Sequence, residues 1–566
     1  MRRRAKAGLI ATATAALCVQ VVPLAEANTA PKSDAVPVGL AEFYAQRPAW
    51  GPCPRPPVPP RRSPDASASA LPRAGSASPA VECTTVRVPL DYRRPDGPRE
   101  TVELSRRLAS DQPNRLGVLV EVPGGPGGQG IYAPEDPAYE ALSTRYDIIG
   151  YNPRGVGQSQ PLLCEGTSVQ VSGRTRFTDA QMRAYTEEFR RRDQQCERAD
   201  GARRPYFTTA NNARDLDIVR AVLGERQLNL MGKSYGTYVT AVYGTLFPKR
   251  LNRNVLDSAI HPQWIWREAW KQQAIAQRRT ADAWMTWVAE RNGIYGLGTT
   301  RSQVRTTIER TRAKLEQRPI DQGDFVYDGT EFDGLIGATN EVAYWDFFAA
   351  TASRLRQQVE TPSDVPGDLG RALALQQEIQ ADPPPTSNGV WEAVNCEAEW
   401  PADLKVYYAD MRYFSEHFPY GWGASAVAPR ECTFGSVERV EPLVKLRRSG
   451  YPTGLVVQEE FDPQTPYEGG RAMADLLGHR LLSVPRDGYH VVHGTNACVD
   501  AAIDDYLLNG KLPKRGAECE GTPIPEVPTD GSARVGEGDR PSLDEQTTLL
   551  SGRIPRPLQA GGRAPS

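Results

Sequence analysis

The chain has 566 residues, of which 39% are hydrophobic and 24% are charged, and its formal net charge is −2. This length exceeds what one hydrophobic core needs, so we expect at least two packed units. A charge so close to zero argues against nucleic acid or an anionic membrane surface as a partner. Beyond the N-terminal segment no stretch approaches about 18 consecutive apolar residues, so we expect no stable membrane association of the mature chain.

The N-terminus is typical of an export signal. Three arginines and Lys6 precede a mostly apolar run that reaches Leu24, and Ala25-Glu26-Ala27 offers small residues at the spacing of a signal-peptidase site. A retained membrane anchor is the alternative interpretation. We expect residues 1–27 to be a signal peptide and the mature protein to be secreted and extracellular.

The cysteines fit an oxidising compartment. Of nine in the chain, Cys18 lies in the signal segment, which leaves an even number for disulfide bonds. No CxxC spacing is present, which argues against metal or redox chemistry. The simplest of the many possible pairings joins sequence neighbours: Cys53 with Cys83, Cys164 with Cys196, Cys396 with Cys432, and Cys498 with Cys519.

Two segments have compositions that cannot bury enough apolar surface to fold. The N-terminal segment 28–80 contains a linker rich in Pro, Ser and Ala, and the tail 521–566 is rich in Gly, Pro and charged residues. We expect the tail to be disordered.

The part between these segments begins with alternating strands and helices. Apolar runs at 116–122, 146–151, 228–231 and 254–257 predict strands, and the first leads into the glycine-rich loop 123–130. Apolar residues at helical spacing predict a helix over 211–223, closed by Gly224, and a second helix runs from the third strand towards residue 247. This order is typical of a mostly parallel sheet with helices on both faces.

The sequence pattern changes between residues 261 and 430. Strand signals fade, tryptophans are frequent, and the run 302–315 has helical periodicity. The alternation of strands and helices then resumes, with predicted strands at 453–458 and 480–484 and a predicted helix at 468–477. We therefore expect a core built from residues 81–260 and 431–520, interrupted by a helical lid at 261–430.

Residues 232–236 read Gly-Lys-Ser-Tyr-Gly and match the G-x-S-x-G motif between a strand and a helix. In this motif the serine sits on a sharp turn, and glycines flank it because a side chain there would clash. The sequence predicts the α/β-hydrolase fold with Ser234 as the nucleophile.

A serine nucleophile needs a histidine base, which in this fold comes last in the chain. His490 and His493 both follow the last predicted strand, and we favour His490, since Gly488 allows the turn before it. The His490-x-x-His493 spacing has no third ligand to accompany it, so we expect no metal and no cofactor.

The acid that orients the base should follow the strand at 453–458. Asp462 lies in the loop after this strand, where Pro463 and Pro466 stiffen the backbone. We favour Asp462, and Glu459, Glu460 and Asp257 are the alternatives.

The tetrahedral intermediate of acyl transfer requires two backbone N–H donors. Tyr235, directly after the nucleophile, is one expected donor. Gly124 or Gly125 in the glycine-rich loop is the other, because glycine lets the backbone approach the substrate closely.

Together these segments resemble the tripeptidyl aminopeptidases secreted by Streptomyces and related actinobacteria, relatives of the prolyl aminopeptidases. The resemblance is carried by ECTTVRVPLDY, PGGPGG, YDIIGYNPRGVGQSQPLLC, GKSYGTY and DPQTP, in this order, and by the His490 region with Cys498 and Cys519. It implies a helical lid and the release of short peptides from free N-termini. It also implies that Ser234, Asp462 and His490 form the catalytic triad.

The chain departs from that family at three places. Asn152 replaces the usual Asp before PRGVG, and Tyr489-His490-Val491 replaces Gly-His-Gly; both changes are expected to affect packing rather than chemistry. Residues 458–460 read Gln-Glu-Glu where a glycine is more usual, which would bring a carboxylate towards the pocket. By resemblance alone, Glu397 and Glu399 are candidates to bind the substrate amine.

The sequence thus predicts a secreted serine exopeptidase that acts on peptides and releases tripeptides or other short units through an acyl-enzyme. An esterase or amidase acting on small molecules with the same triad is the alternative. A secreted binding protein with a decayed hydrolase fold is disfavoured, because Ser234, Asp462 and His490 are all present in the required order.

Overall fold

A computed structural model of the protein describes residues 37–54, 81–164, 175–323, 325–380, 389–530, 542–543 and 545–547. The expected signal peptide at 1–27 and most of the Pro-rich linker lie outside these ranges. None of the helices within them is both long and apolar enough to cross a bilayer.

The described residues form a sheet of ten strands in the order β1-β2-β3-β5-β4-β6-β7-β10-β11-β12. Strands β1, β2 and β3 are antiparallel to their neighbours, and every pairing from β5 to β12 is parallel. The predicted mostly parallel sheet is therefore confirmed. The strands are β1 (Gly51–Pro52), β2 (Glu82–Pro89), β3 (Arg99–Arg107), β4 (Gly117–Val122), β5 (Tyr146–Asn152), β6 (Leu228–Lys233), β7 (Leu251–Asp257), β10 (Leu455–Glu459), β11 (Arg480–Val484) and β12 (Ala517–Glu518).

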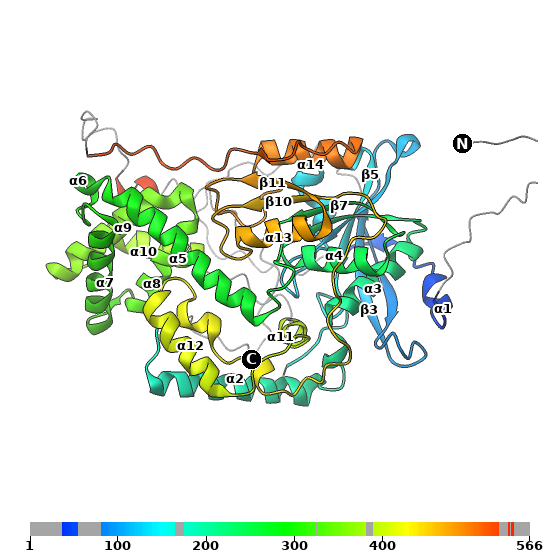
Figure 1. Ribbon diagram of the computed structural model, residues 1–566, viewed down its shortest axis with the longest axis horizontal. Helices are drawn as coiled ribbons and strands as arrows, with labels where there is room; N and C mark the ends of the chain where they lie inside the picture. Colours follow the sequence, from blue (N-terminus) through cyan, green and yellow to red (C-terminus); the bar gives the residue numbers. More distant parts are fainter. Residues whose placement is uncertain are drawn as a thin grey trace, which may run out of the picture.

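Both faces of the sheet are covered by helices. Successive residues of a strand point to opposite faces, so Val118 and Val120 of β4 enter one hydrophobic core and Leu119 enters the other. Helices α3 (Thr209–Val222), α4 (Tyr235–Leu246) and α13 (Tyr467–Leu477) pack on the first face, and α14 (Ala497–Asn509) packs on the second (Figure 1). This arrangement confirms the predicted α/β-hydrolase fold.

Strand register brings the functional loops to one edge of the sheet. Lys233, at the end of β6, is paired with Asp257, at the end of β7. Asp257 is also paired with Val457 of β10. The carboxyl ends of these three strands therefore meet, and the loops that follow them lie beside one another.

The residues between β7 and β10 form a helical unit with its own hydrophobic core, which includes Trp284, Ile308, Phe332 and Phe348. This unit lies beside the sheet (Figure 1). We use the name lid for residues 261–430, the range that the sequence interpretation gives to a lid. Its helices are α5 (Arg267–Ala289), α6 (Asn292–Tyr295), α7 (Arg301–Gln317), α8 (Gly329–Gly337), α9 (Trp345–Glu360), α10 (Gly367–Gln380), α11 (Val390–Asn395) and α12 (Leu404–His417), with a short hairpin of β8 (Ile320–Asp321) and β9 (Val326–Tyr327).

A long helix that the sequence analysis did not predict also joins the lid side. Helix α2 (Asp179–Asp200) runs beside α12, and Met182 packs in a cluster with Met411 and Phe414 of α12 (Figure 1). Most of this helix faces solvent or forms ion pairs, so few of its residues are apolar. The helical periodicity of its apolar residues is therefore weak. The remaining helix, α1 (Ala41–Tyr44), is one turn long.

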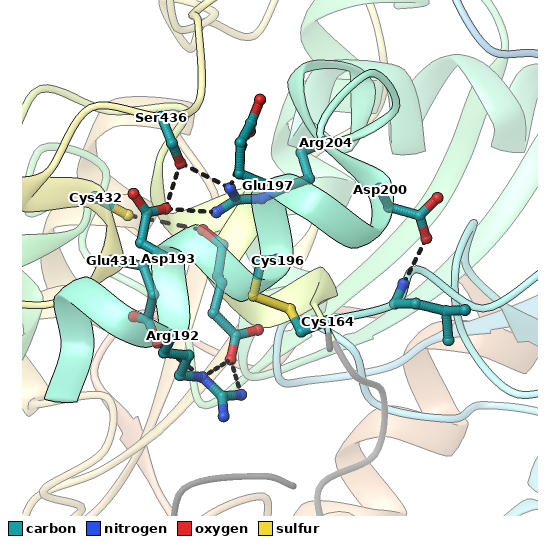
Figure 2. The surroundings of a disulfide bond; sticks show 12 residues. Cys164, Arg192, Asp193, Cys196, Glu197, Asp200, Arg204, Glu431, Cys432 and Ser436 are labelled. Atoms are coloured by element: carbon teal, nitrogen blue, oxygen red, sulfur yellow. Dashed lines mark hydrogen bonds and ion pairs between the residues drawn. A yellow bond between two sulfur atoms is a disulfide. The ribbon is translucent and has the colours of Figure 1, made fainter. Parts of the chain in front are cut away.

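All four predicted disulfide bonds are confirmed: Cys53–Cys83, Cys164–Cys196, Cys396–Cys432 and Cys498–Cys519. The second bond ties α2 to the segment that follows β5 (Figure 2). Beside it, Arg204 contacts Asp193 at 3.1 Å and Arg192 contacts Glu431 at 2.9 Å (Figure 2).

The expectation of a disordered tail from residue 521 is wrong for its first ten residues. The segment 521–530 runs from the core to the lid (Figure 1), where Val527 is buried in the lid core. The backbone N–H of Asp530 donates to Glu290 O at 2.9 Å, and the Asp530 carboxylate accepts from Gly293 N at 2.7 Å. A few apolar residues suffice for this packing. The prediction of disorder was based on the average composition of the whole tail, which does not reveal them.

Candidate active site

Ser234 occupies a sharp turn between β6 and α4. Its backbone has φ 54° and ψ −121°, a conformation that residues other than glycine rarely adopt. A Cβ atom on Gly236 would lie 1.9 Å from Val122 O, and one on Gly232 would lie 2.6 Å from Gly236 O. Both positions therefore require glycine, as the G-x-S-x-G motif predicts.

The expected oxyanion donors lie next to this serine. Tyr235 is the first residue of α4, where a backbone N–H has no acceptor within its own helix. A Cβ atom on Gly124 would lie 3.0 Å from Ser234 Cβ, so the glycine-rich loop after β4 packs directly against the nucleophile. Gly125 follows with φ +109°, a conformation that favours glycine.

His490 and Asp462 form a hydrogen-bonded pair. The His490 Nδ1 atom lies 2.8 Å from Asp462 Oδ2. Asp462 is buried, and its carboxylate also accepts from Gln464 N at 2.8 Å and from the Thr465 hydroxyl at 2.5 Å. With Nδ1 donating to the carboxylate, Nε2 of His490 is the nitrogen that can accept a proton.

Two opposing effects act on the pKa of His490. Burial lowers this pKa, and the neighbouring carboxylates of Asp462, Asp257 and Glu341 raise it. The carboxylates dominate, so the pKa lies above its usual value of 6.5.

The structure also places the alternative base and acid. Burial lowers the pKa of His493 to about 3, and its ring packs edge-on against Tyr139. Neither ring nitrogen of His493 has a hydrogen-bond partner among the described residues. Asp257 accepts backbone N–H groups of residues 492 and 493, and Glu460 accepts the backbone N–H of Arg486. Among the four candidate acids, only Asp462 has a hydrogen bond to a histidine side chain within the described ranges.

Hydrogen bonds hold both the turn with Ser234 and the loop with His490 at the end of β7. The Ser234 N–H donates to Asp257 O at 3.0 Å, and the N–H of Val491 donates to the Ser258 hydroxyl at 2.8 Å. The described residues contain no hydrogen bond between Ser234 Oγ and His490. Catalytic contacts of this kind commonly tighten when substrate binds.

Comparison with known proteins identifies the family. A family model described as TAP-like protein matches residues 418–519. The tripeptidyl aminopeptidase of Streptomyces lividans is 33% identical over 463 residues, which cover 79% of this chain and 85% of the relative. The chain belongs to the TAP-like family.

This TAP-like protein is a serine hydrolase. Other relatives include the serine protease Hip1 of Mycobacterium tuberculosis, 26% identical, with 77% of this chain and 87% of the relative covered. Carboxylesterase B of the same species is 28% identical, with 78% and 86% covered. The names of these relatives thus span peptidases and an esterase.

The two glutamates singled out by resemblance lie in different surroundings in this TAP-like hydrolase. Glu397 is buried and accepts hydrogen bonds from Thr209 N at 2.7 Å, the Thr209 hydroxyl at 2.6 Å and Trp266 Nε1 at 3.2 Å. Burial raises the pKa of Glu397 to about 7. The Glu399 side chain is 83% exposed and contacts Arg439 at 3.0 Å.

A lid carboxylate that the sequence did not predict lies near the base. Glu341 lies between two short helices, η6 (Ala338–Asn340) and η7 (Val342–Tyr344). Its neighbour Asn340 donates to Gly488 O at 3.2 Å, so this part of the lid contacts the loop that carries His490. Burial, with Asp487 and Asp462 nearby, raises the pKa of Glu341 to about 7. No sequence pattern marks Glu341, because its position near His490 depends on how the lid packs against the core.

The lid also contacts the loop that carries the acid. The rings of Trp345 and Phe461 stack with centroids 6.5 Å apart, and Gln273 Nε2 donates to Gln464 O at 2.7 Å. Access to the pair of Asp462 and His490 is therefore bounded by lid residues.

Proposed function

We propose that the protein is a secreted serine exopeptidase that releases tripeptides or other short units from free peptide N-termini through an acyl-enzyme. The observation that carries this proposal is the 33% identity to the tripeptidyl aminopeptidase of Streptomyces lividans, which extends over 79% of the chain. The arrangement of Ser234, Asp462 and His490 supports it, since these residues occur in the order and at the strand ends that the chemistry requires.

In the proposed reaction Ser234 Oγ attacks the scissile carbonyl carbon while His490 Nε2 accepts the hydroxyl proton. Asp462 holds the imidazole in the required tautomer and stabilises the imidazolium. The backbone N–H groups of Tyr235 and of Gly124 or Gly125 stabilise the oxyanion. His490 then donates its proton to the leaving amine, and water hydrolyses the ester on Ser234.

An aminopeptidase must also bind the ammonium group of its substrate, which requires a carboxylate or carbonyl oxygens. Glu397, Glu399 and Glu341 are the candidates. Replacing each by glutamine separates them. Replacement of the residue that binds the ammonium group should raise KM for peptides with a free N-terminus. The same replacement should leave the hydrolysis of small esters unchanged.

Export to the outside of the cell belongs to the proposal. The four disulfide bonds are consistent with an oxidising compartment, and the N-terminal segment has the pattern of a signal peptide. Detection of a mature chain that begins near residue 28 in the culture medium tests this part.

A pair of peptides that differ only at the N-terminus tests the central proposal. Mass spectrometry of the products should show a tripeptide or another short unit released from the free peptide and no cleavage of the acetylated one. The esterase alternative is motivated by the similarity to carboxylesterase B. Equal cleavage of both peptides, or hydrolysis of small esters alone, contradicts the exopeptidase proposal.

A further inference from the structure

Two buried side chains join the loop that carries His490 to the ends of two strands. Ser258 follows β7, and Glu459 is the last residue of β10; neither is accessible to solvent. The Ser258 hydroxyl donates to Glu459 Oε2 at 2.9 Å. The same hydroxyl accepts the N–H of Val491 at 2.8 Å.

Glu459 is the nearer of two carboxylates that can accept the Ser258 hydroxyl proton: Glu459 Oε2 lies at 2.9 Å and Asp257 Oδ1 at 3.5 Å. A serine hydroxyl has one proton to donate and lone pairs that accept. Because its proton is given to Glu459, a lone pair is left to face the Val491 N–H. Without the Glu459 carboxyl group the hydroxyl could turn, and the bond to Val491 would weaken.

The bond to Val491 holds a strained backbone. Val491 has φ +68° and Ser258 has φ +58°. A residue with a side chain is strained in this region, and it keeps this conformation only where its surroundings hold it. Val491 directly follows His490, so a change in the Val491 backbone would move His490 relative to Asp462.

Glu459 lies in the stretch 458–460, where a glycine is more usual in the resembled family. Burial raises the pKa of Glu459 well above its usual value, and the neighbouring carboxylates of Asp257 and Asp462 raise it further. The Glu459 Oε2 atom accepts the hydrogen bond from the Ser258 hydroxyl. A glutamine at this position would offer the same acceptor.

We propose that Glu459, acting through Ser258, is a positioning residue for the His490 base. This inference rests on the proposed catalytic triad. It gives a role to one residue of the stretch 458–460, in which this chain departs from the family pattern.

Steady-state kinetics of four variants tests the inference. Ser258→Ala and Glu459→Leu should lower kcat by about 10- to 100-fold, since small misplacements of a catalytic group cost this much, with KM changed by less than about 2-fold. Glu459→Gln should stay within about 3-fold of the wild-type kcat, because its amide oxygen still accepts from Ser258. Ser483→Ala is the matched control: it removes another buried serine hydroxyl, which contacts the Tyr467 hydroxyl at 2.7 Å, and should leave kcat unchanged.

An unchanged kcat in Ser258→Ala overturns the inference, as does an equal loss of kcat in Glu459→Leu and Glu459→Gln. If Ser258→Ala does not fold, the two Glu459 variants decide. Failure of the triad itself is seen separately, because a fluorophosphonate would then not label Ser234 in the wild-type protein.

Discussion

Two turns at the same edge of the sheet carry the reacting groups, and they are held in different ways. The turn with Ser234 is fixed by close backbone packing around Gly232 and Gly236, where no side chain fits. The loop with His490 is fixed by hydrogen bonds from its backbone to Asp257 and Ser258. A turn built on glycine packing leaves a local motif in the sequence, whereas a loop built on distant side chains leaves none.

The largest effect is expected from replacing the base. His490→Ala should lower kcat by about 10⁶-fold, the loss typical of removing a triad histidine. His493→Phe is the matched control, because the His493 ring is buried and makes no hydrogen bond within the described residues. Purified variants assayed on one unblocked peptide give the comparison, and a severe loss in His493→Phe with little loss in His490→Ala would reverse the assignment.

The next largest effect concerns the acid. Asp462→Asn should lower kcat by about 10⁴-fold, because an amide no longer favours the imidazole tautomer with its proton on Nδ1. Asparagine has nearly the same volume as aspartate, so the melting temperature should change little. Activity within about tenfold of the wild type would show that another carboxylate orients the base.

The glycine turn should be sensitive to a single methyl group. Gly236→Ala is expected to lower the free energy of unfolding by about 3 kcal/mol or more, since its Cβ would meet Val122 O at 1.9 Å. Gly51→Ala is the control, because a Cβ there meets no atom within 4 Å. Chemical denaturation of both variants measures the difference, and equal stabilities would mean that the turn has more room than its packing indicates.

The smallest effect is the pH dependence of the loop's histidine. His490 must be neutral to accept a proton, so kcat/KM should fall as the pH drops through the pKa of His490. Because the carboxylates of Asp462, Asp257 and Glu341 outweigh burial, this pKa lies above 6.5, and half of the maximal kcat/KM should be reached above pH 6.5. A pH profile with its acidic midpoint clearly below 6.5 contradicts this.

Much of the fold was predictable because its signals are local. Apolar runs marked β4, β5, β6, β7, β10 and β11, and the position of Ser234 between a strand and a helix followed from five residues. The simplest cysteine pairing was sufficient, since each bond joins cysteines that are sequence neighbours among those that follow Cys18.

The parts that the sequence analysis missed depend on contacts between distant residues. The bond between Ser258 and Glu459 joins residues 201 positions apart, and Glu341 reaches the site only through the docking of the lid. Helix α2 has a mostly polar sequence and the packed segment 521–530 is rich in proline, so their few buried apolar residues gave no clear period.

The most direct test of the proposed triad is covalent labelling with a fluorophosphonate, followed by mapping of the modified peptide. We expect a label on Ser234 in the wild-type protein, no label in Ser234→Ala, and labelling slowed by orders of magnitude in His490→Ala. A folded wild-type protein that is not labelled, or a labelling rate unaffected by the loss of His490, would contradict the proposed triad.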